Sequence, residues 1–417
     1  MPNLLADIES TTVDTATATS AVMDEMTATV SVAGSGSVLL LIFAFTPEDS
    51  ATDFRLDFDF WAAGAKITGS PTGLSLGDQV DELNGCVMMH AVTGYTGSNT
   101  FAVAWRESTG AGVTDAAYPR TFKIIELLAA EATLLTDLSP TSAAALVTPA
   151  AVITDMTDTK TTAASAKHLM IANFYPDGGS DSQAILQFGI DSTIEGPAVG
   201  TWLDSGSLMS SSCIAWMRTG LSAASHTFQL YGDEIRGAVS AETAVNRTLQ
   251  VVEITANTTV LSDLSPTSAA SSGASYATMT GMTATVTPNN SSSILLLLGT
   301  AYSSGGSDQV ADVRWSVGGA QEGAEMSWYA DLSDGPPGLT MPHVTTGVSG
   351  STAFALEWMS RNSKPAIAVN TSYERSFQVI DFEVGAAPSG RIMSSLANHG
   401  GLAGAGGIAG TGGGLAG

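Results

Sequence analysis

The segment TLLTDLSPTSAA at Thr133–Ala144 recurs as TVLSDLSPTSAA at Thr259–Ala270, so that Asp137 and Asp263 lie 126 residues apart. Working outward, a second shared segment closes each unit, with a spacing of 127 and 128 residues: RTFKIIEL, RTLQVVEI and RSFQVIDF, which begin at Arg120, Arg247 and Arg375. Each unit also has a glycine before a short turn, at Gly94, Gly220 and Gly347. Features recurring at one spacing indicate a tandem repeat.

Each unit has about 127 residues, which is the size of an independent domain rather than of a solenoid repeat. We therefore predict three domains, of which the first is the most diverged, and a tail rich in glycine and alanine. The predicted boundaries are 1–129, 130–256, 257–384 and, for the tail, 385–417.

The hydrophobic runs inside a unit are short, and many alternate apolar with polar residues between Gly, Ser, Asn and Pro. Seven or eight such runs in one unit predict an all-β fold of three tandem antiparallel β-sandwiches, jelly-roll-like in form. The apolar run at 38–45 predicts a central strand buried on both faces. Sandwiches repeated end to end would form a stiff rod.

Composition argues against several classes of partner. The formal net charge is −25, and no basic run is present to neutralise phosphates, so neither nucleic acid nor an anionic membrane is an expected partner. The N-terminus lacks the basic and apolar segments of a signal peptide, and we expect synthesis in a host cytoplasm. Two cysteines are too few for a disulfide framework, so we interpret Cys86 and Cys213 as core residues.

No metal or cofactor motif is visible, and the sequence predicts no enzyme, no metal and no cofactor. The histidines are scattered, without His-Glu-x-x-His or Cys-x-x-Cys spacing. A Gly-x-Ser-x-Gly at 73–77 lacks the strand-to-helix setting of a nucleophile elbow. Asp53, Asp57 and Asp59 alternate along one strand and are interpreted as a solvated face.

Two further features leave alternatives open. The loops at 47–50, 177–181 and 305–308 have oxygen ligands suited to calcium, but plain hairpin loops are favoured. Four tryptophans are either packing residues or platforms for sugar rings: Trp61, Trp202, Trp315 and Trp328.

The repeated anchors are interpreted as architecture. We expect Arg120, Arg247 and Arg375 to brace each unit against a carboxylate or loop carbonyls, and the turn that contains Asp137 or Asp263 to be capped by its own side chains. The tail contains 12 glycines, with Leu402, Ile408 and Leu415 each followed by Ala-Gly. Such a segment cannot bury a core of its own, so we expect it to anchor the protein or to form an oligomer contact.

Two segments carry a resemblance to a known family: TGLSAASHTF at Thr219–Phe228 and RTLQVVE at Arg247–Glu253. Together with the Asp-Leu-Ser-Pro-Thr-Ser turn, they resemble the jelly-roll modules of bacteriophage virion structural proteins, such as tail or head fibres, spikes and capsid decorations. The resemblance implies a non-enzymatic protein located in the virion, displayed on the particle and used in host attachment. Expected partners are other virion proteins, copies of itself as a trimer, and host-surface glycans. A bacterial extracellular adhesin or filament protein is the alternative.

Overall fold

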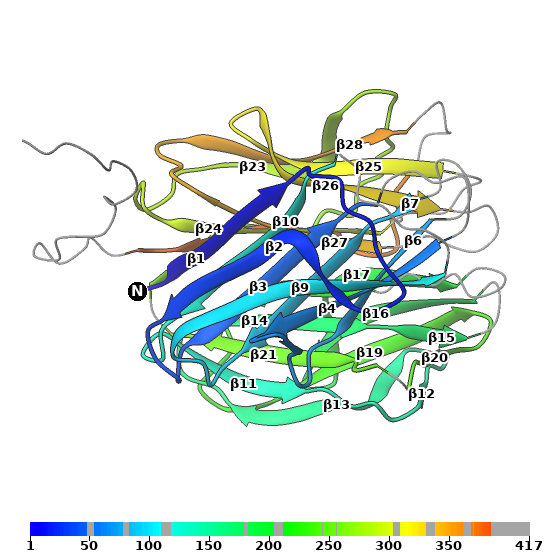
Figure 1. Ribbon diagram of the computed structural model, residues 1–417, viewed down its shortest axis with the longest axis horizontal. Helices are drawn as coiled ribbons and strands as arrows, with labels where there is room; N and C mark the ends of the chain where they lie inside the picture. The colour runs from blue at the N-terminus through cyan, green and yellow to red at the C-terminus, as the bar shows by residue number, and fades with distance from the viewer. Residues whose placement is uncertain are drawn as a thin grey trace, which may run out of the picture. The chain divides into compact units, whose positions relative to one another are not determined.

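The computed structural model describes residues 1–47, 54–77, 83–109, 118–178, 182–203, 212–243, 245–255, 257–302, 309–330, 338–361, 368–369 and 371–384. In these ranges the regular elements are β-strands, and no helix capable of spanning a membrane occurs there. The chain divides into two compact units, Met1–Gly385 and Ala386–Gly417. All the described strands belong to the first unit, and Figure 1 colours them along the chain.

The first repeat forms two antiparallel sheets. One sheet has the strand order β1 (Asn3–Ser10), β10 (Arg120–Leu127), β3 (Val38–Phe45), β8 (Cys86–Val92). The other has the order β2 (Ala21–Val32), β9 (Gly97–Thr109), β4 (Phe54–Ala62), β6 (Thr72–Gly77), β7 (Leu83–Asn84), with β5 (Ala65–Lys66) paired to β4.

The second repeat has the same two sheets and a small third one. The first has the order β11 (Ala132–Leu138), β21 (Thr248–Ile254), β14 (Lys167–Phe174), β18 (Ser212–Arg218). The second has the order β13 (Ala151–Thr161), β19 (Ser225–Arg236), β16 (Ser182–Ile190), β17 (Thr193–Leu203). The small sheet has the order β12 (Ala144–Ala145), β20 (Val239–Ala241), β15 (Pro176–Gly178).

The third repeat again forms two four-stranded sheets. One has the order β22 (Thr258–Leu264), β29 (Ser376–Phe382), β24 (Ile294–Tyr302), β27 (Gly338–Thr346). The other has the order β23 (Ala277–Val286), β28 (Thr352–Ser360), β25 (Gln309–Val317), β26 (Ala320–Ala330).

The strand order is that of a jelly roll in each repeat. Counting its eight main strands along the chain, the first, eighth, third and sixth form one sheet, and the second, seventh, fourth and fifth form the other. Two interlocked Greek keys in facing antiparallel sheets define this fold. The predicted fold class is therefore confirmed, because the alternating runs of the sequence are the strands of all-β sandwiches.

The third strand of each repeat is buried on both faces, as its apolar run predicts. In β3, the side chains of Leu39, Leu41 and Phe43 join the core of the first sandwich. The alternate side chains of Leu40 and Ile42 join a cluster that also holds residues of the second and third repeats. The sheets that contain the third strands thus share one central core, and the expected end-to-end rod is wrong.

Two contacts between repeats are made in the same way, by a glutamine side chain that bonds to the backbone of one residue. The side-chain amide of Gln250 donates from Nε2 to the carbonyl of Ala91 at 2.7 Å, and its Oε1 accepts from the N–H of the same residue at 2.8 Å. Gln378 makes the same pair of bonds to Met217, both at 2.8 Å. An amide side chain matches the donor and acceptor of one peptide group, so each glutamine joins its repeat to the preceding one.

The contact between the first and third repeats lacks such a glutamine. Lys123 takes the place of the glutamine, three residues after Arg120, and a lysine cannot accept a hydrogen bond. Its ammonium pairs with Asp7, and both side chains line a cavity that includes Glu322 and His343 of the third repeat. The position that holds a neutral amide at the other two junctions thus holds an ion pair of the first repeat. The two repeats are joined by Thr46, which donates to the Glu325 carbonyl at 2.8 Å and accepts from the Ser327 N–H at 3.2 Å.

The Lys123–Asp7 ion pair beside this junction predicts a salt effect that Lys123→Gln removes. Raising NaCl to about 1 M reduces the Debye length to about 3 Å and weakens the partly exposed Lys123–Asp7 pair. We expect salt to cost the wild type about 0.5–1 kcal/mol more unfolding free energy than the variant, in urea titrations at low and high salt. Lys160→Gln, which removes the exposed pair with Asp158, is the control. Equal salt dependence of wild type and Lys123→Gln would contradict the assignment.

Candidate binding groove between the first and second repeats

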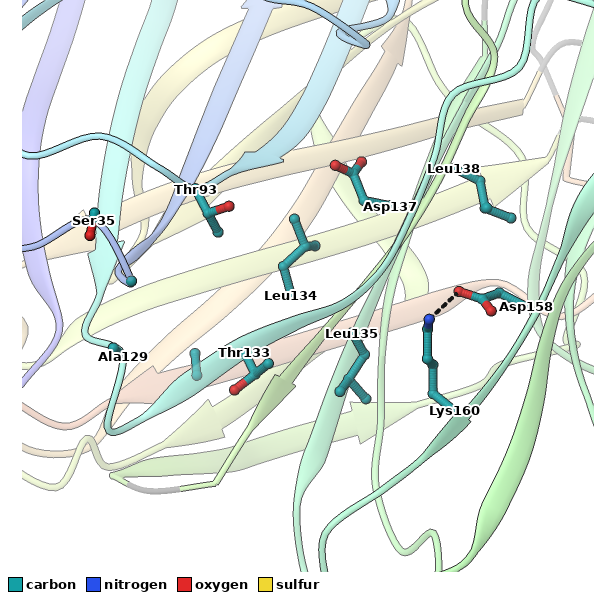
Figure 2. Close-up of a pocket in the computed structure, with 12 residues that line it drawn as sticks. Ser35, Thr93, Ala129, Thr133, Leu134, Leu135, Asp137, Leu138, Asp158 and Lys160 are labelled. Atoms are coloured by element: carbon teal, nitrogen blue, oxygen red, sulfur yellow. Dashed lines mark ion pairs between the residues drawn. The ribbon is translucent and has the colours of Figure 1, made fainter.

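Two adjoining cavities lie where the first repeat meets the second, and they share Thr93 and Asp137. The larger has a volume of about 830 Å³ and the smaller about 260 Å³. Figure 2 shows the larger one, with Ser35 and Thr93 of the first repeat across from the strand that carries Asp137. Together they form a groove in which the two repeats supply opposite walls.

The second repeat presents Asp137 to the groove through an irregular edge strand. The pairing of β11 with β21 shifts register between Leu134 and Thr136, and the equivalent strands β1 and β22 shift at the same place. A bulge of this kind re-aims side chains at a sheet edge. Leu134 and Leu135 are half-buried, while the Asp137 carboxylate is exposed and accepts from Gln250 Nε2 at 2.8 Å.

The lining mixes hydrogen-bonding groups with apolar surface. Lys160 pairs with Asp158 at 3.1 Å on the second repeat's wall, and Figure 2 marks this ion pair. Hydroxyl groups of Ser35, Thr93 and Thr133 line the same cavity. Tyr95 lies in the smaller cavity, with its ring 4.9 Å from that of Phe101. Such a surface can bind a ligand that offers both hydroxyl groups and apolar faces.

His90 borders the groove as a buried neutral imidazole. It is 2% exposed, with its ring 6.5 Å from the ring of Phe60. Burial lowers the pKa of His90 to about 4, and a hydrogen bond with the Gln250 side chain opposes the shift. The imidazole is therefore uncharged at neutral pH beside the glutamine that joins the two repeats.

The repeated arginines lie inside each sandwich and brace backbone carbonyls. Arg247 donates to the carbonyl of Ser142 at 2.5 Å and to that of Thr154 at 2.8 Å. Arg120 does the same with Thr12 and Asp24, and Arg375 donates to the Ser268 carbonyl. These carbonyls belong to the opening turn and, for Arg120 and Arg247, also to the second strand, so the guanidinium ties the two together.

The other anchors have distinct roles. Gly94, Gly220 and Gly347 all have positive φ, between 74° and 89°, which explains the shared glycine. Asp137 and Asp263 accept from glutamine side chains at 2.8 and 3.0 Å, contacts that sequence reasoning missed because the partners lie over a hundred residues away. Leu402, Ile408 and Leu415 lie outside the described residues.

The interpretation of the acidic strand as a solvated face is wrong for Asp57, which is 3% exposed. Its carboxylate pairs with Arg55 at 3.3 Å and Arg106 at 2.8 Å, and accepts from Tyr175 of the second repeat at 3.3 Å. Asp59 pairs with Lys66, and Asp53 is outside the described residues. Pairing with arginine and contact with a second repeat account for the burial.

Asp312 is the third repeat's counterpart of Asp57. Asp57 comes just before Phe58, which pairs with Trp105 of β9. Asp312 comes just before Val313, which pairs with Trp358 of β28. Asp312 is fully buried and pairs with Arg361 at 3.1 Å. The guanidinium of Arg361 in turn lies 4.7 Å from the ring centre of Tyr118 in the first repeat. Buried carboxylates thus mark two contacts between repeats.

Other sequence interpretations have mixed outcomes. Cys86 and Cys213 are buried core thiols as expected. Trp315 is fully buried and donates to the Met341 carbonyl at 3.1 Å, so its suggested role as a sugar platform is wrong. Ser75 of the Gly-x-Ser-x-Gly is buried in β6. Among the described residues, no group of three His, Cys, Asp or Glu side chains fits a metal ion, and the three candidate calcium loops lie largely outside them.

Comparisons with known proteins give little further information. No protein-family model matches the sequence, and no curated protein does. Among solved structures, the chain is similar to one described as "The Triple Jelly Roll Fold and Turret Assembly in an Archaeal Virus". That match has 8% sequence identity and a TM-score of 0.19, and covers 85% of this chain and 81% of the other. Neither the fold nor the role proposed below rests on this likeness.

The buried imidazoles predict acid destabilisation. The folded-state pKa of His90 lies below the value of about 6.5 in an unfolded chain, so the unfolded state binds more protons as the pH falls from about 6.5 towards 4. Burial also lowers the pKa of His168 and His343. We expect His90→Gln to reduce the loss of unfolding free energy between pH 7 and pH 4 by about 2–3 kcal/mol in urea titrations. Parallel pH curves for variant and wild type would contradict this account.

Proposed function

We propose that this chain is a structural protein of a virus particle, displayed on its surface as a fibre, spike or capsid decoration. The observation that supports it best is a single chain in which three jelly rolls share one buried core. Such a block is rigid and presents many loops at its surface. Loops on a rigid scaffold can change for receptor contact without disturbing the core.

Attachment to a host surface is the second part of the proposal. The groove between the first and second repeats offers hydroxyl, carboxylate and ammonium groups beside leucine and tyrosine surface. Glycans combine hydroxyl groups with apolar ring faces, so a host-surface glycan is the proposed ligand. Many copies on one particle would convert weak binding at each groove into firm attachment. Binding of the purified chain to a glycan array tests this part.

The proposed partners are other virion proteins and further copies of the chain, as a trimer. Residues 385–417 follow the last strand that the structure describes and have the composition of a segment that needs a partner. We propose that they attach the protein to the particle. A bacterial extracellular adhesin or filament protein remains the alternative, and such a protein would be found on the cell surface rather than in purified particles.

Deletion of residues 385–417 tests the proposal. We expect mass spectrometry to find the full-length chain in purified particles of the virus that encodes it, and to lose it when the tail is deleted. Circular dichroism should show that the truncated chain keeps its β structure, because the described strands end at Phe382. Normal incorporation of the truncated chain would overturn the role of the tail, and absence of the full-length chain from particles would overturn the virion role.

A further inference from the structure

Three polar side chains meet at one end of the second sandwich, and two of them, Ser222 and His226, belong to the segment Thr219–Phe228. His226, the second residue of β19, has its Nδ1 at 2.7 Å from a carboxylate oxygen of Asp191. Its Nε2 lies 3.3 Å from the hydroxyl of Ser222. A serine within reach of an imidazole that a carboxylate orients is the arrangement of a serine nucleophile and its base.

The carboxylate is held by a tight two-residue turn. Asp191 and Ser192 form the turn between β16 and β17, with φ of 51° and 69°. The equivalent turns are Ala63-Gly64 in the first repeat and Gly318-Gly319 in the third. A turn with two positive φ values accepts Asp at its first position and favours glycine at its second, so Asp191 suits the turn and Ser192 is the less favourable residue. From this turn the Asp191 carboxylate also accepts a hydrogen bond from the Thr227 N–H at 2.8 Å.

The first repeat shows which side chain is enough to hydrogen-bond the loop that follows the shared glycine, the loop that contains Ser222 in the second repeat. Asn99 stands where the second repeat has His226, since each is followed by Thr-Phe. It donates to the carbonyls of Thr96 and Gly97 at 3.0 Å each. In the first repeat, one asparagine side chain therefore supplies the hydrogen bonds to this loop's carbonyls, without a histidine or a carboxylate. The carbonyl of Ser222 already accepts from the Ala224 N–H at 2.9 Å and the Thr162 hydroxyl at 2.7 Å. Nε2, 3.2 Å from that carbonyl, is not needed to satisfy it.

The protonation states suit a general base. The Thr227 N–H, followed by His226, lowers the pKa of Asp191, so its carboxylate is ionised at neutral pH. An ionised Asp191 fixes the proton on Nδ1, which leaves Nε2 as an acceptor facing the Ser222 hydroxyl. Ser222 is exposed, so a substrate can reach it from solvent.

We propose that Ser222, His226 and Asp191 hydrolyse carboxylic esters carried at the surface of a larger molecule, such as acetyl esters on a polysaccharide. This activity lies beyond the proposed structural role and does not depend on it. Because the serine lies on an exposed loop, short acyl groups projecting from a polymer are the substrates that can reach it.

The reaction balances with water as the second substrate. The Ser222 oxygen bonds to the ester carbonyl carbon while its proton moves to His226 Nε2. The bond from that carbon to the alcohol oxygen then breaks, and Nε2 returns the proton to the leaving alcohol. Water repeats the sequence on the acyl-serine, which releases a carboxylic acid and restores the hydroxyl. The N–H of Ala223, next along the chain, is the proposed donor to the oxyanion.

Labelling with a fluorophosphonate and hydrolysis of p-nitrophenyl acetate by the full-length chain test the proposal. We expect the wild type to be labelled at Ser222 and to hydrolyse the ester. Ser222→Ala should abolish labelling, and His226→Gln should lower the rate roughly a hundredfold or more. Ser225→Ala, which changes an exposed serine at the start of β19, is the matched control and should keep full activity. Absence of labelling, or wild-type hydrolysis no faster than that of Ser222→Ala, would overturn the proposal.

Asp191 is a positioning residue, and its test must separate orientation of the imidazole from loop stability. We expect Asp191→Asn to lower kcat with KM unchanged, because an amide no longer fixes the proton on Nδ1. Asp191→Glu should restore part of the rate, whereas Asp191→Gly should relax the turn without restoring activity. Equal activity of the Asn and wild-type chains would show that the carboxylate serves the turn alone, and would overturn its proposed role.

Discussion

The structure depends on the burial of the third strand of each repeat on both faces. One set of its side chains fills the repeat's own sandwich, and the alternate set faces the other two repeats. A strand buried on one face only would leave apolar residues such as Leu40 and Ile42 in water, at about 25 cal/mol for each Å² exposed. The three sandwiches therefore stabilise one another, and the stability of each repeat includes its contacts with its neighbours.

Polar contacts then fix how the repeats meet. Hydrophobic packing is not directional, whereas the paired bonds of Gln250 and Gln378 to single peptide groups allow only one register between sheets. Between the first and third repeats, the Thr46 hydroxyl bonds to the backbone of Glu325 and Ser327, and the Lys123–Asp7 ion pair of the first repeat lines a cavity with residues of the third. Hydrogen bonds to backbone groups thus fix all three contacts between repeats, and beside the contact between the first and third an ion pair of the first repeat stands in place of the glutamine.

The sequence predicted the all-β class because its strand runs are short, alternating and separated by turn residues. It also indicated the burial of the third strand, since β3 is apolar throughout. It did not show that the outer face of this strand meets other repeats, because an apolar run is the same whatever covers it. The Asp57 burial was missed for a related reason: its contact with Tyr175 joins residues of different repeats.

The polar sites were harder to predict. Asp137 and Asp263 were singled out as turn residues, but their partners are glutamines that lie far along the chain. Ser222, His226 and Asp191 come from two separate loops and the start of a strand, so no spacing rule brings them together. The groove likewise combines segments of two repeats. Short-range sequence patterns indicate strands and turns. These sites instead form where the topology and the packing between repeats bring distant segments together.

The shared core is the central claim, and differential scanning calorimetry of the full-length chain tests it most directly. If the three jelly rolls unfold as one cooperative unit, a single transition should appear, with a calorimetric enthalpy about equal to the van't Hoff enthalpy. Independent sandwiches would instead give separate transitions, or a calorimetric enthalpy about three times the van't Hoff value. The second result would contradict a core held in common.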